Sequence, residues 1–124
     1  MDITPLIPAD RQVIHGYSPG EFVVNGVVHR HAVLVFPERV LAWPVTAFSE
    51  ITIESLLPVC EAQPAVEILL LGCGLKIALL SSELRRAMRE RGVRIEVMDT
   101  GAACRTYVVL LSEGRRVAAA LLPV

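Results

Sequence analysis

The stretch VRIEVMDTGAACRTYVVLLSEGRRVAAALLPV, residues 93–124, predicts a strand, a helix and a second strand in direct succession. VRIEVM has the short apolar pattern of a strand, and the longer segment that follows places Ala103, Tyr107 and Leu110 on one helical face. Gly114 stands just past the predicted helix, and VAAALLPV follows as a buried strand. Because the helix joins two apolar strands, the stretch indicates a sheet with parallel strand pairs and covered faces.

The residues before this stretch repeat the same order. VEILLLG, residues 66–72, is a buried strand, and SSELRRAMRERG is a helix with arginines and glutamates on one side. Ser81 or Ser82 can cap the start of this helix, and Gly92 is well placed just after its end. The second half of the chain is therefore predicted as strand, helix, strand, helix, strand.

The first half is predicted as strands and turns. Asn25-Gly26 stands between β-branched residues and predicts a hairpin, because both residues tolerate the positive φ angles of a type I′ turn. Residues 32–36 predict a strand covered on both faces, residues 40–43 a further short strand, and residues 52–62 a short helix. The antiparallel strands of this half make the predicted sheet mixed.

The composition sets limits on partners and location. The 124 residues are 53% hydrophobic with a mean hydropathy of +0.54, so part of the apolar excess is expected in an oligomer or partner interface. A net charge of −1 gives no bulk field to attract nucleic acid. We find no apolar run of membrane-spanning length and no signal peptide, and we expect one cytoplasmic domain over residues 1–124, with residues 1–12 as an extended arm.

The two strand-to-helix junctions form the candidate ligand site. Gly72 and Gly74 follow one predicted parallel strand, and Thr100 and Gly101 follow the next. Such junctions meet at the carboxyl edge of a sheet, where helix amides favour an anion and Arg105, about one turn into the helix, could face it. The spacing matches neither a dinucleotide fingerprint nor a phosphate loop. The site is thus predicted from topology alone.

A structural explanation of the same residues carries more weight. Arg105 could pair with Asp99 or Glu96, or point to solvent, and the glycines could serve only tight turns.

Other reactive residues give weaker hypotheses. Cys104 lies early in a helix beside a positive charge, and Cys73 lies between two glycines, so either thiol could act as a nucleophile, although a buried packing role is favoured. His29 and His31 alternate on a strand and could share a metal, but surface histidines are the favoured interpretation. We therefore assign no catalytic residue, no metal and no cofactor.

Four segments together resemble a known family. They are IHGYSPGEFVVNG (14–26), VLVFPERVLAW (33–43), ILLLGCG (68–74) and IEVMDTGAACRTYVVLLSEGRRVAAALL (95–122). They are similar to the small α/β family that includes mitochondrial NADH dehydrogenase (respiratory complex I) assembly factor 3 and the adipogenesis-associated domain proteins of animals, with uncharacterised bacterial members. The resemblance implies a three-layer α/β fold: a central mixed β-sheet with helices on one side and an additional β-hairpin layer on the other. It implies no catalytic residues.

These observations lead to one functional hypothesis and one alternative. The first is a non-enzymatic module that binds protein partners and assists the assembly of a respiratory or other membrane complex. We expect its contact surface among apolar residues left exposed, with Trp43, Phe48 and the hairpin tip as candidates. The alternative is a small-ligand or anion-binding protein that uses Gly72, Gly74, Thr100, Gly101 and Arg105.

Overall fold

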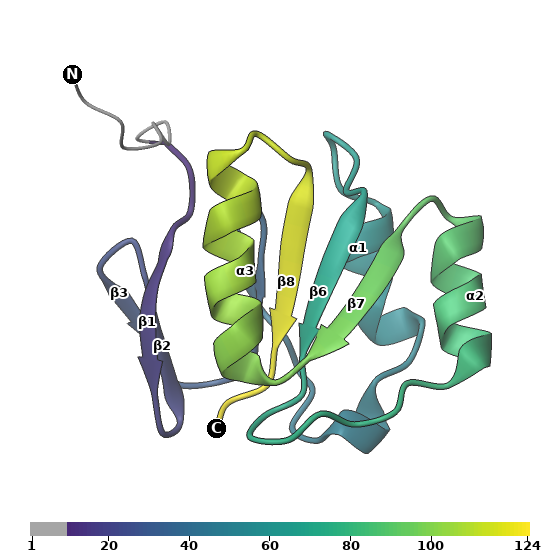
Figure 1. Ribbon diagram of the computed structural model, residues 1–124, viewed down its shortest axis with the longest axis horizontal. Coiled ribbons are helices and arrows are strands. Elements are labelled where there is room, and N and C mark those ends of the chain that lie inside the picture. The colour runs from purple at the N-terminus through teal and green to yellow at the C-terminus, as the bar shows by residue number, and fades with distance from the viewer. Residues whose placement is uncertain (1–9) are drawn as a thin grey trace.

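A computed structural model describes residues 10–124 and contains two β-sheets with helices packed around them (Figure 1). Residues 1–9, most of the predicted N-terminal arm, lie outside the described part of the chain. The elements, with η for short 3₁₀ helices, are β1 (Ile14–Ser18), β2 (Glu21–Val24), β3 (Val27–His29), β4 (Val33–Val35), β5 (Val40–Ala42), η1 (Phe48–Glu50), η2 (Glu54–Leu56), α1 (Leu57–Cys60), β6 (Ile68–Gly72), α2 (Ser82–Glu90), β7 (Arg94–Met98), α3 (Thr100–Ser112) and β8 (Val117–Leu121).

The larger sheet has the strand order β5-β4-β8-β6-β7 and is mixed, as predicted. β6 pairs in parallel with both β7 and β8, whereas β4 pairs antiparallel with β5 and β8. Gly72 at the end of β6 is in register with Met98 of β7 and Leu121 of β8. The carboxyl ends of these three strands therefore lie together at one edge of the sheet, which we call the carboxyl rim.

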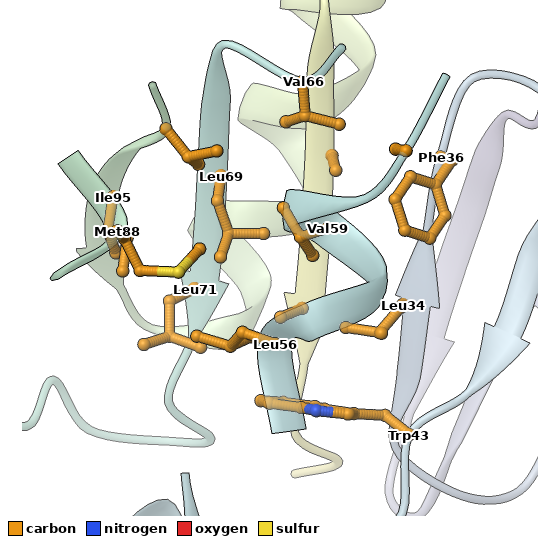
Figure 2. Packing of buried hydrophobic residues seen from close by; sticks show 14 of the residues in the cluster. Leu34, Phe36, Trp43, Leu56, Val59, Val66, Leu69, Leu71, Met88 and Ile95 are labelled. Atoms are coloured by element: carbon orange, nitrogen blue, oxygen red, sulfur yellow. The ribbon is translucent and has the colours of Figure 1, made fainter. Parts of the chain in front are cut away.

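Both faces of this sheet are covered, and α3 shares one face with the small antiparallel sheet β1-β2-β3 (Figure 1). α1 and α2 cover the opposite face, where Leu56, Val59 and Met88 pack on β6 and β7 (Figure 2). The layers thus match the three-layer expectation, but the helices are divided between the two faces. The reason is that α3 packs a face of Ala103, Cys104 and further apolar residues onto the β8 residues Val117, Ala119 and Leu121.

Local sequence signals identify most of the turns and caps. The Ser81 hydroxyl accepts a hydrogen bond from the Leu84 amide at 3.2 Å, as expected for the cap of α2. Asn25 and Gly26 have φ angles of 49° and 79°, which confirms the predicted hairpin between β2 and β3. The predicted short helix over residues 52–62 is present as η2 followed by α1, with a proline in the first turn of α1.

Candidate functional site

The two strand-to-helix junctions meet at the carboxyl rim. The Cys73 amide donates to the carbonyl oxygen of Met98 at 2.9 Å, and the Thr100 amide donates to that of Gly74, also at 2.9 Å. The junction after β6 and the junction before α3 therefore lie side by side on the same edge of one sheet. This was the geometric condition on which the predicted ligand site depended.

Thr100 joins the two junctions to the end of β8. Its side chain is fully buried, and its hydroxyl donates to the Leu122 carbonyl oxygen at 2.7 Å while accepting from the Gly74 amide at 2.8 Å. Gly72 makes this contact sterically feasible, because a Cβ atom there would lie 3.0 Å from both the Cα and Oγ1 atoms of Thr100. A single hydroxyl thus connects three chain segments at the rim.

The start of α3 is capped from within the chain. The Asp99 carboxylate accepts a hydrogen bond from the Ala102 amide at 2.8 Å, and the Ala103 amide donates to the Asp99 carbonyl oxygen. The junction amides of Cys73, Gly74 and Thr100 and the first capped amides of α3 are therefore engaged within the chain, which favours the structural explanation. Ligand binding by Gly72, Gly74, Thr100 and Gly101 stays a prediction, and this geometry gives it no support.

Arg105 lies on the exposed side of α3, next to Tyr17 of β1, a residue distant from it in sequence. A Cβ atom at Gly101 would lie 3.3 Å from the Arg105 Nη1 atom and 3.0 Å from the Tyr17 Cζ atom. Within residues 10–124, no carboxylate lies within 4.0 Å of the Arg105 guanidinium, and Glu96 pairs with Arg94 instead. Arg105 is thus exposed beside the Tyr17 ring of β1.

The two cysteines near the rim are poor nucleophiles in this structure. Burial raises the pKa of the Cys104 thiol from 9.0 to about 11, although the adjacent Arg105 charge acts in the opposite direction. Burial also raises the pKa of Cys73. Since the thiolate is the reactive form, both residues fit the packing role that the sequence favoured.

We expect alkylation to report this burial. With iodoacetamide at pH 7.5, Cys104 in the folded protein should react at least about 100-fold more slowly than in the protein unfolded by guanidinium, because its thiolate fraction is about 100-fold lower and access is restricted. Mass spectrometry of tryptic peptides over time gives both rates. A folded-state rate equal to the unfolded rate would show that Cys104 is an accessible thiolate.

His29 and His31, at the end of the hairpin, do not form a metal site with other residues of the described part of the chain. The rings of His29 and His31 lie edge to face with their centroids 5.9 Å apart, and the Nδ1 atom of His31 is 2.9 Å from the Ala32 carbonyl oxygen. From residue 10 onward, no group of three or more His, Cys, Asp or Glu side chains is placed to hold a metal ion.

An apolar loop at the carboxyl rim is the exposed surface that sequence analysis missed. Leu75, Ile77 and Leu79, between β6 and α2, are 80%, 64% and 94% exposed. They alternate with Lys76 and Ala78 and follow directly from the Gly72–Gly74 junction. We call residues 75–79 the rim loop. The apolar run was visible in the sequence, but its exposure depends on the tertiary fold, in which no element of residues 10–124 packs over it.

The apolar residues predicted from the sequence as the partner-contact surface differ in their exposure. Trp43 is buried, only 2% exposed, and its Nε1 atom donates to the Ser55 carbonyl oxygen at 2.9 Å, so the candidate assignment was wrong (Figure 2). Phe48 is half-buried and packs against the core. The hairpin tip is exposed as expected, at Val27 and Val28.

An apolar cleft of about 660 Å³ opens close to this rim. It is lined by Trp43, Pro44 and Val45 after β5 and by Pro123 after β8, with Arg30 and His31 at its border. The carbonyl oxygen of Pro123 lies 3.8 Å from the position of a Cβ atom at Gly74. The rim therefore carries both an exposed apolar loop and a concave apolar surface. None of the helices in the described residues is long and apolar enough to cross a membrane.

These features define a class: a small mixed α/β protein whose carboxyl rim is closed by internal hydrogen bonds and displays an apolar loop. The family described as "Protein of unknown function (DUF498/DUF598)" matches residues 14–122, and the chain belongs to it. This confirms the family resemblance seen in the sequence.

Named relatives extend from animals to bacteria. NADH dehydrogenase (ubiquinone) 1 alpha subcomplex assembly factor 3 of Danio rerio is 40% identical over 111 residues, covering 90% of this chain and 64% of that protein. An uncharacterized protein of Rhodobacter capsulatus is 44% identical over 110 residues, covering 89% of this chain and 83% of that protein. The chain spans less than two thirds of the length of the assembly-factor relatives.

A solved structure supports the fold directly. A crystal structure of a protein from Bordetella parapertussis superposes with a TM-score of 0.86 at 40% sequence identity. The superposition covers 94% of this chain and all of that one. The arrangement of two sheets and three helices described above is therefore shared with a related bacterial protein.

Proposed function

We propose that this protein is a non-enzymatic interaction module that assists the assembly of a respiratory membrane complex. The observation that carries the proposal is the rim loop, in which Leu75, Ile77 and Leu79 point away from the core. Exposed apolar clusters on a small protein are costly in water and are typical of surfaces that bind a partner. The relatives named as assembly factors of NADH dehydrogenase supply the class of partner.

The base of the loop suits such a role. The junction at its start is held by the Thr100 hydroxyl, and its other end leads into α2 through the capping residue Ser81. A loop fixed at both ends loses less conformational freedom on binding than a free segment does. We therefore propose that the partner contributes an apolar surface that covers these three side chains. Cytoplasmic location and self-association stay predictions.

The test uses a strain that lacks the chromosomal gene and is supplied with plasmid variants. The variant Leu75→Ser/Ile77→Ser/Leu79→Ser should assemble much less NADH dehydrogenase than wild type, measured on native gels. Losing three buried aliphatic side chains from an interface is expected to weaken association by about 100-fold or more. The same variant should fold normally, because the three side chains are largely exposed and do not belong to either core cluster of residues 10–124.

A matched control tests whether the loss of assembly is specific to the rim loop or follows from removing any exposed aliphatic side chain. The variant Val109→Ser removes an exposed aliphatic side chain of α3, outside the rim loop and the hairpin tip, and should support wild-type assembly. Unchanged NADH dehydrogenase in the deletion strain would overturn the assembly role. Full rescue by the rim-loop variant would instead show that another surface makes the contact.

A further inference from the structure

A second concave feature lies away from the rim loop, between β1 and α3. The two elements run alongside each other on the same face of the larger sheet (Figure 1). The cavity between them has a volume of about 300 Å³. Its walls are Ile14, Gly16 and Tyr17 from β1, and Cys104, Arg105 and Val108 from α3.

Both ends of the β1 wall are fixed by long-range contacts. Before the strand, the carbonyl oxygen of Gln12 accepts a hydrogen bond from the buried Tyr107 hydroxyl at 2.9 Å. After the strand, the Gly20 amide donates to the carbonyl oxygen of Val124, also at 2.9 Å. The fold itself therefore holds the β1 wall of the cavity in place, which lowers the entropic cost of binding a ligand.

A bulge in the backbone of β1 lies at the wall of the cavity. Ile14 and Gly16 are in register with the adjacent residues Val24 and Val23 of β2, so one extra residue forms a bulge at this point. A Cβ atom at Gly16 would meet no atom within 4 Å. A larger side chain at position 16 therefore has free space to occupy. A substitution at this position can be used to block the cavity.

The lining of the cavity is mostly apolar. Ile14 and Cys104 are buried, and Val108 continues the apolar surface along α3. The exposed side chains of His15, Tyr17 and Arg105 also line it, and Arg105 supplies a permanent positive charge. No aspartate or glutamate is among the described residues that line the cavity, and none of those in residues 10–124 pairs with Arg105.

We propose that this cavity binds a small organic carboxylate with an apolar body. The carboxylate lies against Arg105, whose planar guanidinium can donate two parallel hydrogen bonds to it, and the body packs on Ile14 and Val108. The volume is at the lower end of the range for small-molecule pockets, so the ligand is small. This site is separate from the paired glycine junctions, and it stands independently of the proposed assembly role.

The test is a titration of the ¹⁵N-labelled protein with octanoate, followed by amide chemical shifts. We expect saturable shifts confined to residues 14–17 and 104–108. Arg105→Gln should weaken octanoate binding about tenfold or more, because the charged hydrogen bonds are lost. Gly16→Leu should abolish binding by filling the cavity. The control Arg115→Gln, which removes an exposed arginine elsewhere, should bind as wild type does.

Two further probes define the chemistry. Octanol, which keeps the apolar body without the charge, and inorganic phosphate, which keeps an anion without the body, should each bind more weakly than octanoate. Absence of saturable shifts at residues 14–17 and 104–108 up to about 10 mM octanoate would overturn the proposal. Equal affinity of wild type and Arg105→Gln would also overturn it, and this comparison holds even if Gly16→Leu does not fold.

Discussion

Replacing Thr100 with valine will lower the free energy of unfolding by about 2–5 kcal/mol. Valine has nearly the same shape, so packing is kept, but the hydroxyl is lost. The Gly74 amide loses the acceptor of its hydrogen bond, and the Leu122 carbonyl oxygen loses its donor, both inside a fully buried site. Leaving buried polar groups unpaired costs about 1–3 kcal/mol for each group. Urea denaturation followed by circular dichroism measures the change.

Thr100→Ser is the matched control for this substitution. Serine keeps the hydroxyl and removes one methyl group, so its cost should be about 1 kcal/mol. If serine were as destabilising as valine, packing of the methyl group would contribute as much to the rim as the two hydrogen bonds do. Equal stability of Thr100→Val and wild type would show that the three segments are not joined through this hydroxyl.

The fold was largely predictable because its signals are local. The apolar strands that became β6, β7 and β8, the cap at Ser81 and the turn at Asn25-Gly26 each depend on residues close in sequence. The division of helices between the two faces of the sheet was not predictable in this way. It depends on where α3 packs relative to the chain that leads into the small sheet, and that contact joins Tyr107 to Gln12, 95 positions apart.

The site was predictable only in part, for a related reason. Topology brought Gly72 and Gly74 beside Thr100 and Gly101, as expected for parallel strands. The sequence alone could not show that the Thr100 hydroxyl would form hydrogen bonds with backbone groups of the junction. The Tyr17 ring beside Gly101 depends on contacts across 84 positions, and burial of Trp43 depends on a partner carbonyl in a separate segment.

The closed junction and the exposed rim loop are two parts of one arrangement. Hydrogen bonds at Gly74 and Thr100 fix the chain where it leaves β6, and the loop begins at the next residue. If the proposed assembly role holds, the junction supplies a rigid base and the loop supplies the contact surface. Substitutions at the base should then affect stability first, whereas substitutions at Leu75 or Leu79 should affect the partner and leave stability unchanged.

Gly72 is a position of this base at which neighbouring backbone restricts a side chain, and Gly72→Ala should lower the free energy of unfolding by about 1–3 kcal/mol, with Gly72→Val costing more. A Cβ atom would lie 3.0 Å from the Leu121 Cδ2 atom and from the Cα and Oγ1 atoms of Thr100. The backbone of α3 cannot yield as a flexible side chain can, so the helix start must move. This movement should also lengthen the hydrogen bond that the Thr100 hydroxyl accepts.

The sign of the effect makes this prediction decisive, because glycine-to-alanine changes at unstrained positions normally stabilise a protein by about 0.4–1 kcal/mol. Gly16→Ala provides that reference: its Cβ atom meets nothing within 4 Å, so we expect equal or higher stability than wild type. Denaturant midpoints of the two variants, compared with wild type, give both values. A stabilising Gly72→Ala would mean that the start of α3 does not rest against β6, and the rim would then lack the rigid base from which residues 75–79 extend.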